Sequence, residues 1–571
     1  MTLPAKRWLI TEPDEAHVQS IAVAHDLAVP LARVLVNRGH VDEQEITTFL
    51  DPALNRVGDP FALPDMEKAV ARIWQAIDRK ESVLVFGDYD VDGVTSTTLL
   101  TRILDRLGNR PKSFIPHRIT DGYGLTLESF ENVREKYAPQ LIITVDCGTG
   151  SVEAVAAAQD QGVDVIVTDH HETSTGVAEA FAVVNPKLGK EDSIQMLAGV
   201  GVAFKLCHAL LKQGRDDGRE TAEKLDLRRF MHLVAMGTVA DMVPLVGENR
   251  ILAAFGIDEL NRCTEPGIAA LGKVACIREA FNAYHVGFLL GPRINAAGRM
   301  DHSGAALDLL LTGERADAEA LALALDTANR ERQEMEKQMF SEAEQQIDRY
   351  FQPDETFGIV VANEGWHPGV VGIVASRLVQ KYYRPVVVIG IDENGLGKGS
   401  CRSIDAFDLV GGLGKVSGHL ERFGGHKMAA GLQIQRGHVD AFRMDFNRVA
   451  AEVLIDEALV PQIKIDAWLE PAEVNYPLCT QTERFMPFGL KNPAPVWAIN
   501  DVAISDKRRV GDGHMKLVVD LAGRRVDAIA FNRVPDELPE GRVDLVFQLK
   551  ISRFRGAENL QLTVLDFRAA T

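Results

Sequence analysis

The sequence predicts an α/β protein in which a parallel-sheet domain and a second α/β domain are joined by a long helix and followed by a small β-barrel. Three observations support this prediction. Between residues 66 and 168, short apolar segments alternate with helical ones, as in doubly wound parallel sheets. A long polar helical segment covers 314–349, and a second alternating region follows it. From about residue 461, five β-patterned segments follow one another closely.

Composition limits the possible classes of protein. The chain has 571 residues with 46% hydrophobic content, enough for several domains. Its six cysteines form no CxxC pair, which argues against a zinc ribbon or a disulfide framework and fits a reducing cytoplasm. Without a signal-peptide core or a membrane-length apolar segment, we expect a soluble cytoplasmic protein. The net charge of −19 argues against nonspecific attraction to nucleic acid, although a local basic groove can outweigh it.

The first elements follow a polar preamble, residues 1–65, whose function the sequence does not indicate. The pattern predicts helices at 66–79, 94–107, 127–137 and 152–161, and strands at 83–86, 112–116, 141–145 and 164–168. Further helices over 198–211 and 225–239 would complete this first core.

Acidic and histidine residues follow several of these segments. They are Asp88, Asp90, Asp92, Asp146, His170, His171 and, after an apolar segment at 230–239, Asp241. Taken singly, a solvated turn, a surface histidine pair or a helix cap explains each of them. Taken together, they predict convergence at the carboxyl edge of one sheet, where open α/β folds bind ligands.

Carboxylates this close repel one another unless a cation lies between them. Their oxygens suit Mg²⁺, Mn²⁺ or Ca²⁺. Five aspartates with one or two histidines are about the number needed for two cations with open water positions, the arrangement used in phosphoester hydrolysis.

Two later segments separate the first core from the second α/β region, and the first of them has features of a phosphate-binding site. Arg293, Asn295 and Arg299 are expected in a glycine-punctuated loop that approaches a phosphate. The polar segment 314–349 predicts a helix bridging two lobes, although an ordinary surface helix explains the pattern nearly as well.

The second α/β region predicts strands at 358–362 and 386–390 with a helix at 370–382 between them. The glycines near Lys398 suggest a nucleotide-binding loop, but their spacing differs from GxxxxGK[ST], which excludes a P-loop and an ATP-driven mechanism. A strand through Ser400 and Arg402 instead places the hydroxyl and guanidinium on one face.

The C-terminal strands, expected at 496–504, 515–520, 526–531, 543–551 and 560–567, fit an OB-type barrel, a common platform for single strands. Basic residues such as Lys507, Arg508 and Arg509 suit contact with a phosphate backbone, although solvated loop charges would give the same pattern.

Eight motifs resemble known families. GDYDVDG at 87–93, VDCG at 145–148, DHH at 169–171 and GTVADMV at 237–243 resemble, in this order, the motifs of the DHH phosphoesterase superfamily. GPRINAAGR at 291–299, WHPGVVG at 366–372, GSCRS at 399–403 and FGGHKMAAG at 423–431 are similar to the RecJ family of bacterial single-strand-specific exonucleases. The resemblance implies hydrolysis of single-stranded DNA from the 5′ end to 5′ mononucleotides, with Mn²⁺ or Mg²⁺, in DNA repair and recombination.

The same resemblance implies roles for individual residues. It implies metal ligation by Asp88, Asp90, Asp92, Asp146, His170 and Asp241, with Asp146 bridging two ions and His171 facing the scissile phosphate. It implies substrate binding by Arg118, Arg293, Asn295, Arg299, His367, Ser400, Arg402, Gly424, Gly425 and His426. The expected mechanism is in-line attack by water, activated by the ions, without a covalent intermediate.

The resemblance also implies an organisation and partners. The expected parts are the preamble, 1–65, a DHH catalytic domain, 66–270, a connecting loop and helix, 271–350, a DHH-associated substrate domain, 351–455, and an OB-type domain, 456–571. The associated domain would close over the terminal nucleotide, and the gap between lobes would exclude a duplex. Single-stranded DNA, a helicase and a single-strand-binding protein are the expected partners of a monomer.

Two positions depart from family patterns, and two alternatives remain. Phe86 stands where small pyrophosphatases and cyclic-dinucleotide hydrolases carry a ligand histidine, which disfavours those members. Lys491 replaces a glycine in the turn at 488–493, which puts that turn in doubt. The alternatives are a phosphodiesterase of short RNA or cyclic dinucleotides and a catalytically inactive DNA-binding replication factor, against which the intact aspartates argue.

Overall fold

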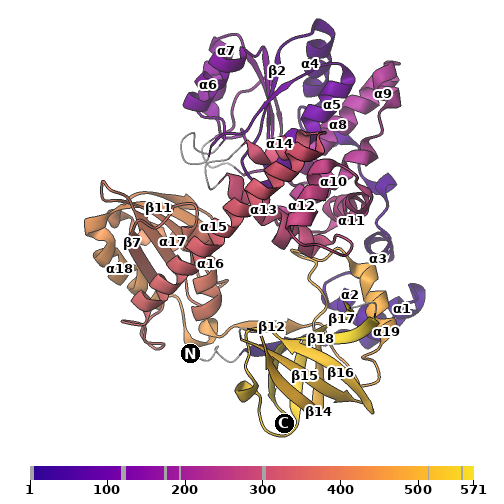
Figure 1. Cartoon of the computed structure of the whole chain (residues 1–571), viewed down its shortest axis with the longest axis vertical. Coiled ribbons are helices and arrows are strands. Elements are labelled where there is room, and N and C mark those ends of the chain that lie inside the picture. Colours follow the sequence, from indigo (N-terminus) through magenta and orange to yellow (C-terminus); the bar gives the residue numbers. More distant parts are fainter. Residues whose placement is uncertain are drawn as a thin grey trace. The chain divides into compact units, whose positions relative to one another are not determined.

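The structure is a computed structural model that describes residues 6–117, 124–172, 176–191, 194–298, 304–511, 513–554 and 557–570. The chain forms two compact units (Figure 1). One comprises Ile10–Asp326 with Ile465–Thr571, and the other comprises Met1–Leu9 with Thr327–Lys464. Among the described residues, no single helix is long and apolar enough to cross a membrane; two N-terminal helices pass that test only as a pair bent by 117°.

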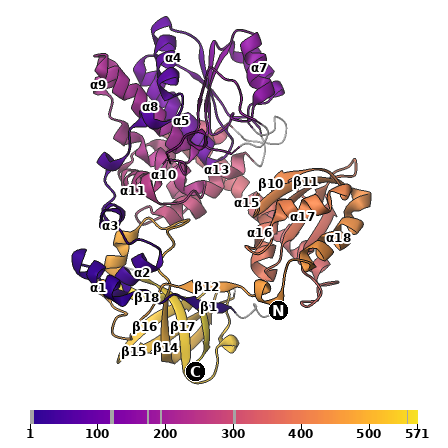
Figure 2. The same cartoon turned by 180° about the vertical axis from the view of Figure 1, so that it is seen from behind.

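The larger unit contains a five-stranded parallel sheet in the order β3-β2-β4-β5-β6. Its strands are β2 (Val83–Phe86), β3 (Lys112–Phe114), β4 (Leu141–Val145), β5 (Asp164–Thr168) and β6 (Ala182–Val184). Helices α4 (Met66–Arg79), α5 (Val91–Leu107) and α8 (Gly199–Asp216) pack on one face, and α6 (Leu127–Tyr137) and α7 (Val152–Asp160) on the other (Figure 2).

Strand β2 shows why this sheet is buried on both faces. Val83 and Val85 enter the core under α4, α5 and α8, whereas Leu84 and Phe86 enter the core under α6 and α7. A continuous apolar strand is therefore needed, as predicted for a doubly wound sheet. The predicted elements are confirmed, except that α5 begins at Val91 and β3 ends at Phe114.

Further helices complete the part of this unit that surrounds the parallel sheet. They are α9 (Glu220–Lys224), α10 (Met231–Ala240), α11 (Gly247–Arg262), α12 (Pro266–Val274), a π-helix (His285–Leu290), α13 (Gly291–Ala297) and α14 (Ala305–Leu311). The glycine-punctuated loop predicted around Arg293 and Asn295 is wrong, because both residues lie in α13. Pro292 stands in the first turn, where proline is tolerated, and Ile294 supplies a buried face.

A closed five-stranded barrel forms the C-terminal part of the larger unit. It consists of β14 (Trp497–Val510), β15 (His514–Leu521), β16 (Arg524–Ala530), β18 (Ala557–Ala569) and β17 (Val543–Phe554), and pairing between β14 and β17 closes it. The predicted OB-type barrel is confirmed. The short strand β13 (Ala467–Trp468) pairs with β14, and helix α19 (Tyr476–Thr482) packs against β17.

The N-terminal helices share a core with this barrel. Helices α1 (Glu15–Ala24), α2 (Val29–Asn37) and α3 (Glu43–Leu50) contribute Leu31, Leu35 and Phe49 to the cluster that contains Trp497 and Phe547 of the barrel. Buried Arg250 of α11 donates to the carbonyls of Phe49, Arg484 and Phe485 and so connects both parts to the helices around the parallel sheet. The preamble is therefore part of the barrel's packing.

The turn at 488–493 forms despite its lysine. Lys491 has φ +60°, the left-handed region that favours glycine, and Gly489 and Asn492 are bridged across the turn. The Leu245 amide, after α10, donates to the carbonyl of Leu490 at 2.8 Å. These contacts therefore hold the turn, although a lysine stands at a position where glycine would be favoured.

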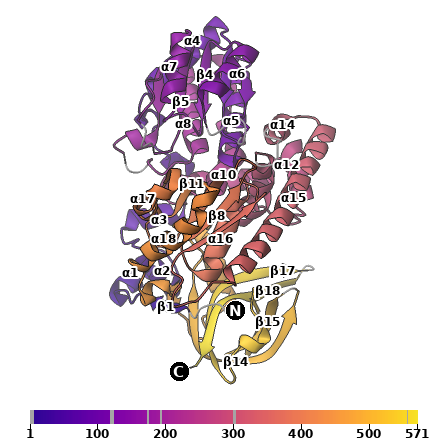
Figure 3. The same cartoon turned by 90° about the vertical axis from the view of Figure 1, so that its left-hand side faces the viewer.

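The smaller unit is built on the sheet β10-β11-β9-β8-β7 (Figure 3). Its strands are β7 (Ile359–Glu364), β8 (Val386–Ile391), β9 (Leu396–Arg402), β10 (Leu420–Gly425) and β11 (Ala429–Gln435), and only β7 and β8 are parallel. Helices α16 (Val371–Tyr382) and the end of α15 (Arg315–Ile347) cover one face, and α17 (Leu409–Lys415) and α18 (Val439–Ala451) the other. In addition, β1 (Arg7–Ile10) pairs with β12 (Gln462–Ile465).

Candidate metal centre

Carboxylates and a histidine from four segments meet at the carboxyl edge of the parallel sheet. Asp88 follows β2, Asp146 follows β4 and His170 follows β5. Asp90 and Asp92 stand at the start of α5, and Asp241 comes from the end of helix α10, not from a strand. The structure thus brings together all six residues for which metal ligation was predicted.

The distances within this cluster describe two adjoining sets of ligand atoms. His170 Nε2 lies 3.1 Å from Asp146 Oδ1, 3.6 Å from Asp241 Oδ2 and 3.8 Å from Asp92 Oδ2. Asp92, His170 and Asp241 could hold one ion, and Asp88, Asp90 and Asp146 another. Because Asp146 also groups with His170, it is the carboxylate placed to serve both sets.

Helix starts fix two of the aspartates. Asp90 Oδ1 accepts a hydrogen bond from the Gly93 amide at 3.1 Å and so caps α5. Asp92 accepts from the amides of Gly199 and Val200, at 2.6 and 2.8 Å, at the positive end of α8. Gly93 must lack a side chain, since a Cβ there would lie 2.4 Å from the Asp88 carbonyl oxygen.

Asp146 has an unusual backbone. Its φ is +61°, a left-handed conformation that costs a non-glycine residue free energy, of order 1–3 kcal/mol where the surroundings enforce it. The side chain is buried, and Gly199 at the start of α8 packs directly against it. Such local strain is concentrated at functional sites, which fits the central position of Asp146.

Asp169 organises the histidines, and sequence reasoning missed it as a site residue. Its carboxylate accepts from the amides of Thr149, His170 and His171, and His171 Nδ1 lies 2.8 Å from its Oδ1. Buried Asn185 adds a hydrogen bond to the His171 carbonyl. The one available signal was the position of Asp169 at the head of the motif at 169–171.

The histidines have opposite electrostatic environments. Burial lowers the pKa of His170 to about 4, and the charge of His171 adds to this effect. Burial also acts to lower the pKa of His171, but the hydrogen bond and charge of Asp169 outweigh it and raise that pKa to about 9. His170 is therefore a neutral ligand candidate, and His171 carries a positive charge beside the cluster.

The carboxylates oppose one another's ionisation. Burial raises the pKa of Asp92 to about 7, with a contribution from Asp90, and burial together with Asp92 raises that of Asp241 to about 9. Burial and four neighbouring aspartates raise the pKa of Asp146 well above its usual value. Carboxylates packed this way are compatible only with bound protons or with a cation.

The donor set fits divalent cations. Asp146 Oδ1 and His170 Nε2 are buried and make no hydrogen bond to any residue that the structure describes. Aspartate oxygens with a single imidazole are ligands that suit Mn²⁺ and Mg²⁺, whereas thiolate-rich sets select softer metals. Phe86, where the small-molecule hydrolases carry a histidine, is fully buried against Phe114 in the core below the site.

In the smaller unit, Ser400 and Arg402 lie on one face of β9, as expected. Arg402 Nη1 donates to Ser400 Oγ at 3.0 Å. The start of α16 packs against both, since a Cβ on Gly372 would lie 3.0 Å from Ser400 Oγ and 3.2 Å from Arg402 Nη2. A hydroxyl, a guanidinium and a helix start therefore share one small region, which is a chemistry suited to phosphate.

The other predicted substrate residues have diverse positions. Gly424 and Gly425 end β10 and His426 begins the turn to β11, whose Gly431 pairs with both Gly424 and Ser400. His367 lies in the turn before α16.

In the larger unit, Arg293 forms an ion pair with buried Asp326 at 2.9 Å, and Asn295 Oδ1 accepts from the Val91 amide. Arg118 and Arg299 lie outside the described residues. The roles of all these residues in substrate binding stay predictions.

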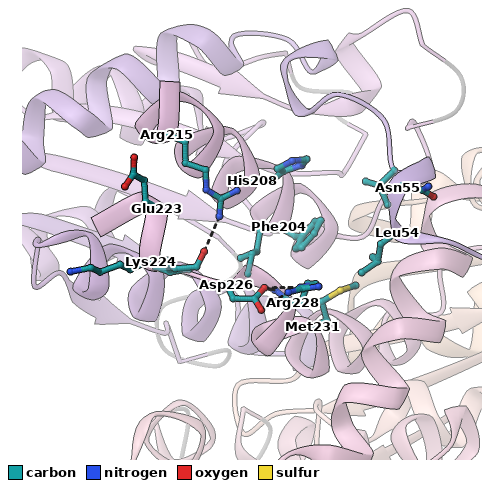
Figure 4. Close-up of a pocket in the computed structure, with 13 residues that line it drawn as sticks. Leu54, Asn55, Phe204, His208, Arg215, Glu223, Lys224, Asp226, Arg228 and Met231 are labelled. Carbon is teal, nitrogen blue, oxygen red and sulfur yellow. Dashed lines mark hydrogen bonds and ion pairs between the residues drawn. The ribbon is translucent and has the colours of Figure 1, made fainter. Parts of the chain in front are cut away.

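A pocket of about 520 Å³ lies apart from the metal cluster (Figure 4). Phe204, Leu225 and Met231 supply the apolar lining of this pocket, and its arginine side chains have partners within the protein. Arg215 donates to the Leu225 carbonyl, and Arg228 pairs with Asp226 at 2.9 Å. None of the predicted site residues lines this pocket.

Comparison with known proteins agrees with this geometry. Residues 82–238 match the DHH family, N-terminal domain, residues 355–452 the DHHA1 domain, and residues 465–566 the RecJ OB domain. The chain is 37% identical to the single-stranded-DNA-specific exonuclease RecJ of Haemophilus influenzae, covering 94% of this chain and 95% of that protein. It is 35% identical to the Escherichia coli RecJ with the same coverage.

Solved structures give the same result. The crystal structure of RecJ from Thermus thermophilus in complex with Mn²⁺ matches with a TM-score of 0.84 and 30% identity, covering 99% of this chain and 80% of that one. The Mg²⁺ complex from the same organism matches with a TM-score of 0.78 and 29% identity, over 99% and 79%. The chain therefore belongs to the RecJ family of single-stranded-DNA-specific exonucleases, within the DHH superfamily.

Proposed function

We propose that the protein degrades single-stranded DNA from its 5′ end and releases 5′ mononucleotides, using two divalent cations. The observation that carries this proposal is the pair of adjoining ligand sets that share Asp146, found in a member of this exonuclease family. Mn²⁺ or Mg²⁺ would be held by Asp88, Asp90, Asp92, Asp146, His170 and Asp241. When bound, the two ions supply activation of water and stabilisation of the leaving 3′ oxygen.

The protein's own groups prepare the site for a phosphodiester. Asp169 holds His171 at 2.8 Å and keeps it protonated, so its positive charge can bind the scissile phosphate. His170, whose pKa is lowered to about 4, is neutral near pH 7 and presents Nε2 to the carboxylates as a ligand candidate. The amides at the start of α8 donate to both oxygens of the Asp92 carboxylate and fix its orientation, which limits the reorganisation needed when a cation binds.

Recognition of the 5′ end is assigned to the smaller unit. A terminal phosphate has one more ionisable oxygen than an internal one, so charged donors can discriminate between them. Arg402 provides such a donor, and Ser400 and the start of α16 at Gly372 provide neutral donors in the same region of that unit. We assign Gly424, Gly425, His426 and His367 to the same substrate surface.

The barrel would bind the single strand, and other proteins would supply it. Since the substrate is single-stranded, we infer that a helicase generates it and that the enzyme acts on strands carrying single-strand-binding protein. We also infer that the enzyme acts in the cytoplasm, where its DNA substrate is found. We expect it to be a monomer.

The test is cleavage of end-labelled oligonucleotides, single-stranded and duplex, with and without Mn²⁺. A 5′ label should appear at once as mononucleotide, whereas a 3′ label should pass through progressively shorter strands, and duplex should resist. Asp146→Ala should reduce turnover by orders of magnitude, while Asp105→Ala, at an exposed aspartate of α5, should not. No cleavage by the parent would favour the inactive DNA-binding alternative, and faster cleavage of short RNA or cyclic dinucleotides the other one.

A further inference from the structure

Two exposed aromatic side chains stand next to each other close to the catalytic core. Tyr284 is 60% exposed and Phe288 is 69% exposed, the two largest exposures among aromatic residues that the structure describes as exposed hydrophobics. Their rings are stacked, with centroids 5.1 Å apart and planes inclined by 26°. Exposing two stacked rings to water is unfavourable, and such an exposed apolar pair is typical of a binding site.

The backbone beneath the two rings is fixed. Phe288 lies in the π-helix His285–Leu290, a geometry that occurs frequently at functional sites, and Tyr284 immediately precedes it. Between them, His285 is buried and lies 3.3 Å from Glu279, and its amide donates to Asn282 Oδ1. The rings are therefore presented by a rigid segment and need little ordering when a ligand binds.

The same segment packs against two of the elements that carry metal-ligand candidates, α5 and α10. A Cβ on Gly287 would lie 3.8 Å from Val239 of α10, two residues before Asp241. A Cβ on Gly291 would lie 3.5 Å from Ala240 and 3.6 Å from Val91, the residue between Asp90 and Asp92. The aromatic pair thus belongs to the helical segment that borders the metal centre.

The barrel belongs to the same compact unit as this segment and the metal-ligand candidates. Burial lowers the pKa of Lys550 on β17, and the charge of Glu279, at the N-terminal end of the segment, acts on this lysine and opposes that lowering. A single strand held by the barrel would have to pass from the barrel to the metal-ligand candidates within this unit.

We propose that Tyr284 and Phe288 form a stacking platform for bases of the single strand between the barrel and the metal centre. Aromatic faces stack on every base, so the platform would hold DNA without regard to sequence, as an exonuclease requires. It would set the register in which the phosphates approach the metal centre. Because Glu279 would repel phosphates, contact is expected through the bases and not through the backbone. The inference rests on the proposed exonuclease function.

The first test compares binding of single-stranded DNA in an Asp146→Ala background, in which the strand is not degraded. Phe288→Ala and Tyr284→Ala should weaken binding roughly 5- to 100-fold, the range expected for one lost stacked base. Phe288→Trp should restore binding and Phe288→Leu should not, because the π-face and not bulk is required. Met444→Ala is the matched control, since Met444 is also 69% exposed but lies on α18.

The second test locates the base that stacks. An abasic nucleotide is moved along the oligonucleotide one position at a time. At the stacking position, the abasic nucleotide should weaken binding to the protein with Phe288 by the same factor as Phe288→Ala weakens binding of intact DNA. The abasic nucleotide and Phe288→Ala combined should weaken binding no more than either change alone. The fluorescence of 2-aminopurine at that position should be quenched when the protein with Phe288 binds, and should not be quenched by the Phe288→Ala variant.

Three results separate the inference from the function on which it rests. If the parent protein degrades single strands, but Phe288→Ala binds them within about twofold of the Met444→Ala control, the platform does not bind DNA and the inference is wrong. The inference is also wrong if the abasic position and Phe288→Ala weaken binding independently at every position. If the parent does not degrade single strands at all, the proposed function itself fails.

Discussion

Asp146 is the residue on which the proposed metal centre depends. It is buried, has a left-handed backbone and belongs to two of the candidate ligand sets. Burial and the neighbouring aspartates raise its pKa, so a proton and a cation compete for the same oxygens. Asp169 has the complementary role: hydrogen bonds from His171 and Thr149 outweigh burial and lower its pKa to about 2, which keeps it ionised beside His171.

At the residue scale, the role of Arg402 can be tested directly. Arg402→Ala should remove any preference for 5′-phosphorylated over 5′-hydroxyl strands, because the extra phosphate oxygen loses its charged donor. A lost charged hydrogen bond costs roughly 1.5–3 kcal/mol, or about a 10- to 100-fold change in kcat/KM. Arg448→Ala, at an exposed arginine of α18, is the control. A variant that keeps the full preference would disprove the assignment.

The residues show what the sequence could and could not predict. The convergence of the candidate ligands was predictable because β2, β4 and β5 are continuous apolar segments, and polar residues that follow them must meet at one edge. The role of Asp169 was not, because it depends on hydrogen bonds to Thr149, distant in sequence. The partner of Arg293 was missed for the same reason, since Asp326 is 33 residues away.

At the element scale, the start of α8 shapes the centre from outside the ligand set. Its first amides hold Asp92, and Gly199 packs against Asp146. The sequence predicted this helix but not its role, because helical periodicity shows which face is buried and not which side chain a helix end will contact. The helical state of residues 291–297 was missed since glycine and proline are typical of loops as well as of first helical turns.

Gly199→Ala tests the packing of α8 against Asp146. A Cβ at this position would lie 2.5 Å from Asp146 Oδ1 and 2.7 Å from its Cβ, so the carboxylate must move. We expect turnover to fall about 100-fold, the cost of displacing a reacting group by about 1 Å, with little change in melting temperature. Gly201→Ala is the matched control, because the nearest atoms to its Cβ would all belong to the Leu197 side chain, at 3.2 Å or more, and not to a candidate ligand. Equal activity of the two variants would contradict the role of Gly199.

A second element-scale prediction concerns the ion pair between α10 and α12. Burial acts against both charges, but Cys263 and the Glu265 carboxylate, 3.4 Å from His232 Nε2, raise the pKa of His232 to about 9, and His232 and Arg102 lower that of Glu265 to about 2. The contribution of His232 to stability is fully present below its unfolded pKa of 6.5 and is lost as the pH rises through about 9.

His232→Gln should therefore destabilise the protein more at about pH 6 than at about pH 10, by on the order of 2 kcal/mol. The measurement is chemical denaturation of both proteins at the two pH values. Glu265→Gln should remove the same pH dependence. A cost of His232→Gln that does not change with pH would show that the pair is held by packing and not by charge.

At the scale of the whole molecule, the barrel and the N-terminal helices act as one folded part. Leu31, Leu35 and Phe49 are buried in the same core as Trp497, so deletion of the barrel would expose them. Sequence patterns revealed the barrel strands, whose alternation is local, but not this association, which joins the two ends of the chain. The DNA-binding role of the barrel is therefore better tested by substitution than by truncation.

Replacing Lys507, Arg508 and Arg509 together with glutamine should weaken binding of long single strands and flatten its salt dependence. All three are exposed on β14. Each phosphate contact on a single strand contributes about −0.7 to the slope of log K against log salt, so the slope should become less negative by up to about 2. Cleavage of very short oligonucleotides should change little. A slope equal to that of the parent would show that these residues do not contact the strand.

The central claim is that one cluster holds two catalytic cations and that Asp146 serves both. Anomalous diffraction from crystals of the protein soaked in Mn²⁺ tests it most directly. We expect two manganese peaks in the cluster, one among Asp88, Asp90 and Asp146 and the other among Asp92, His170 and Asp241, with Asp146 in contact with both. A single peak, or two peaks of which only one contacts Asp146, would contradict the account.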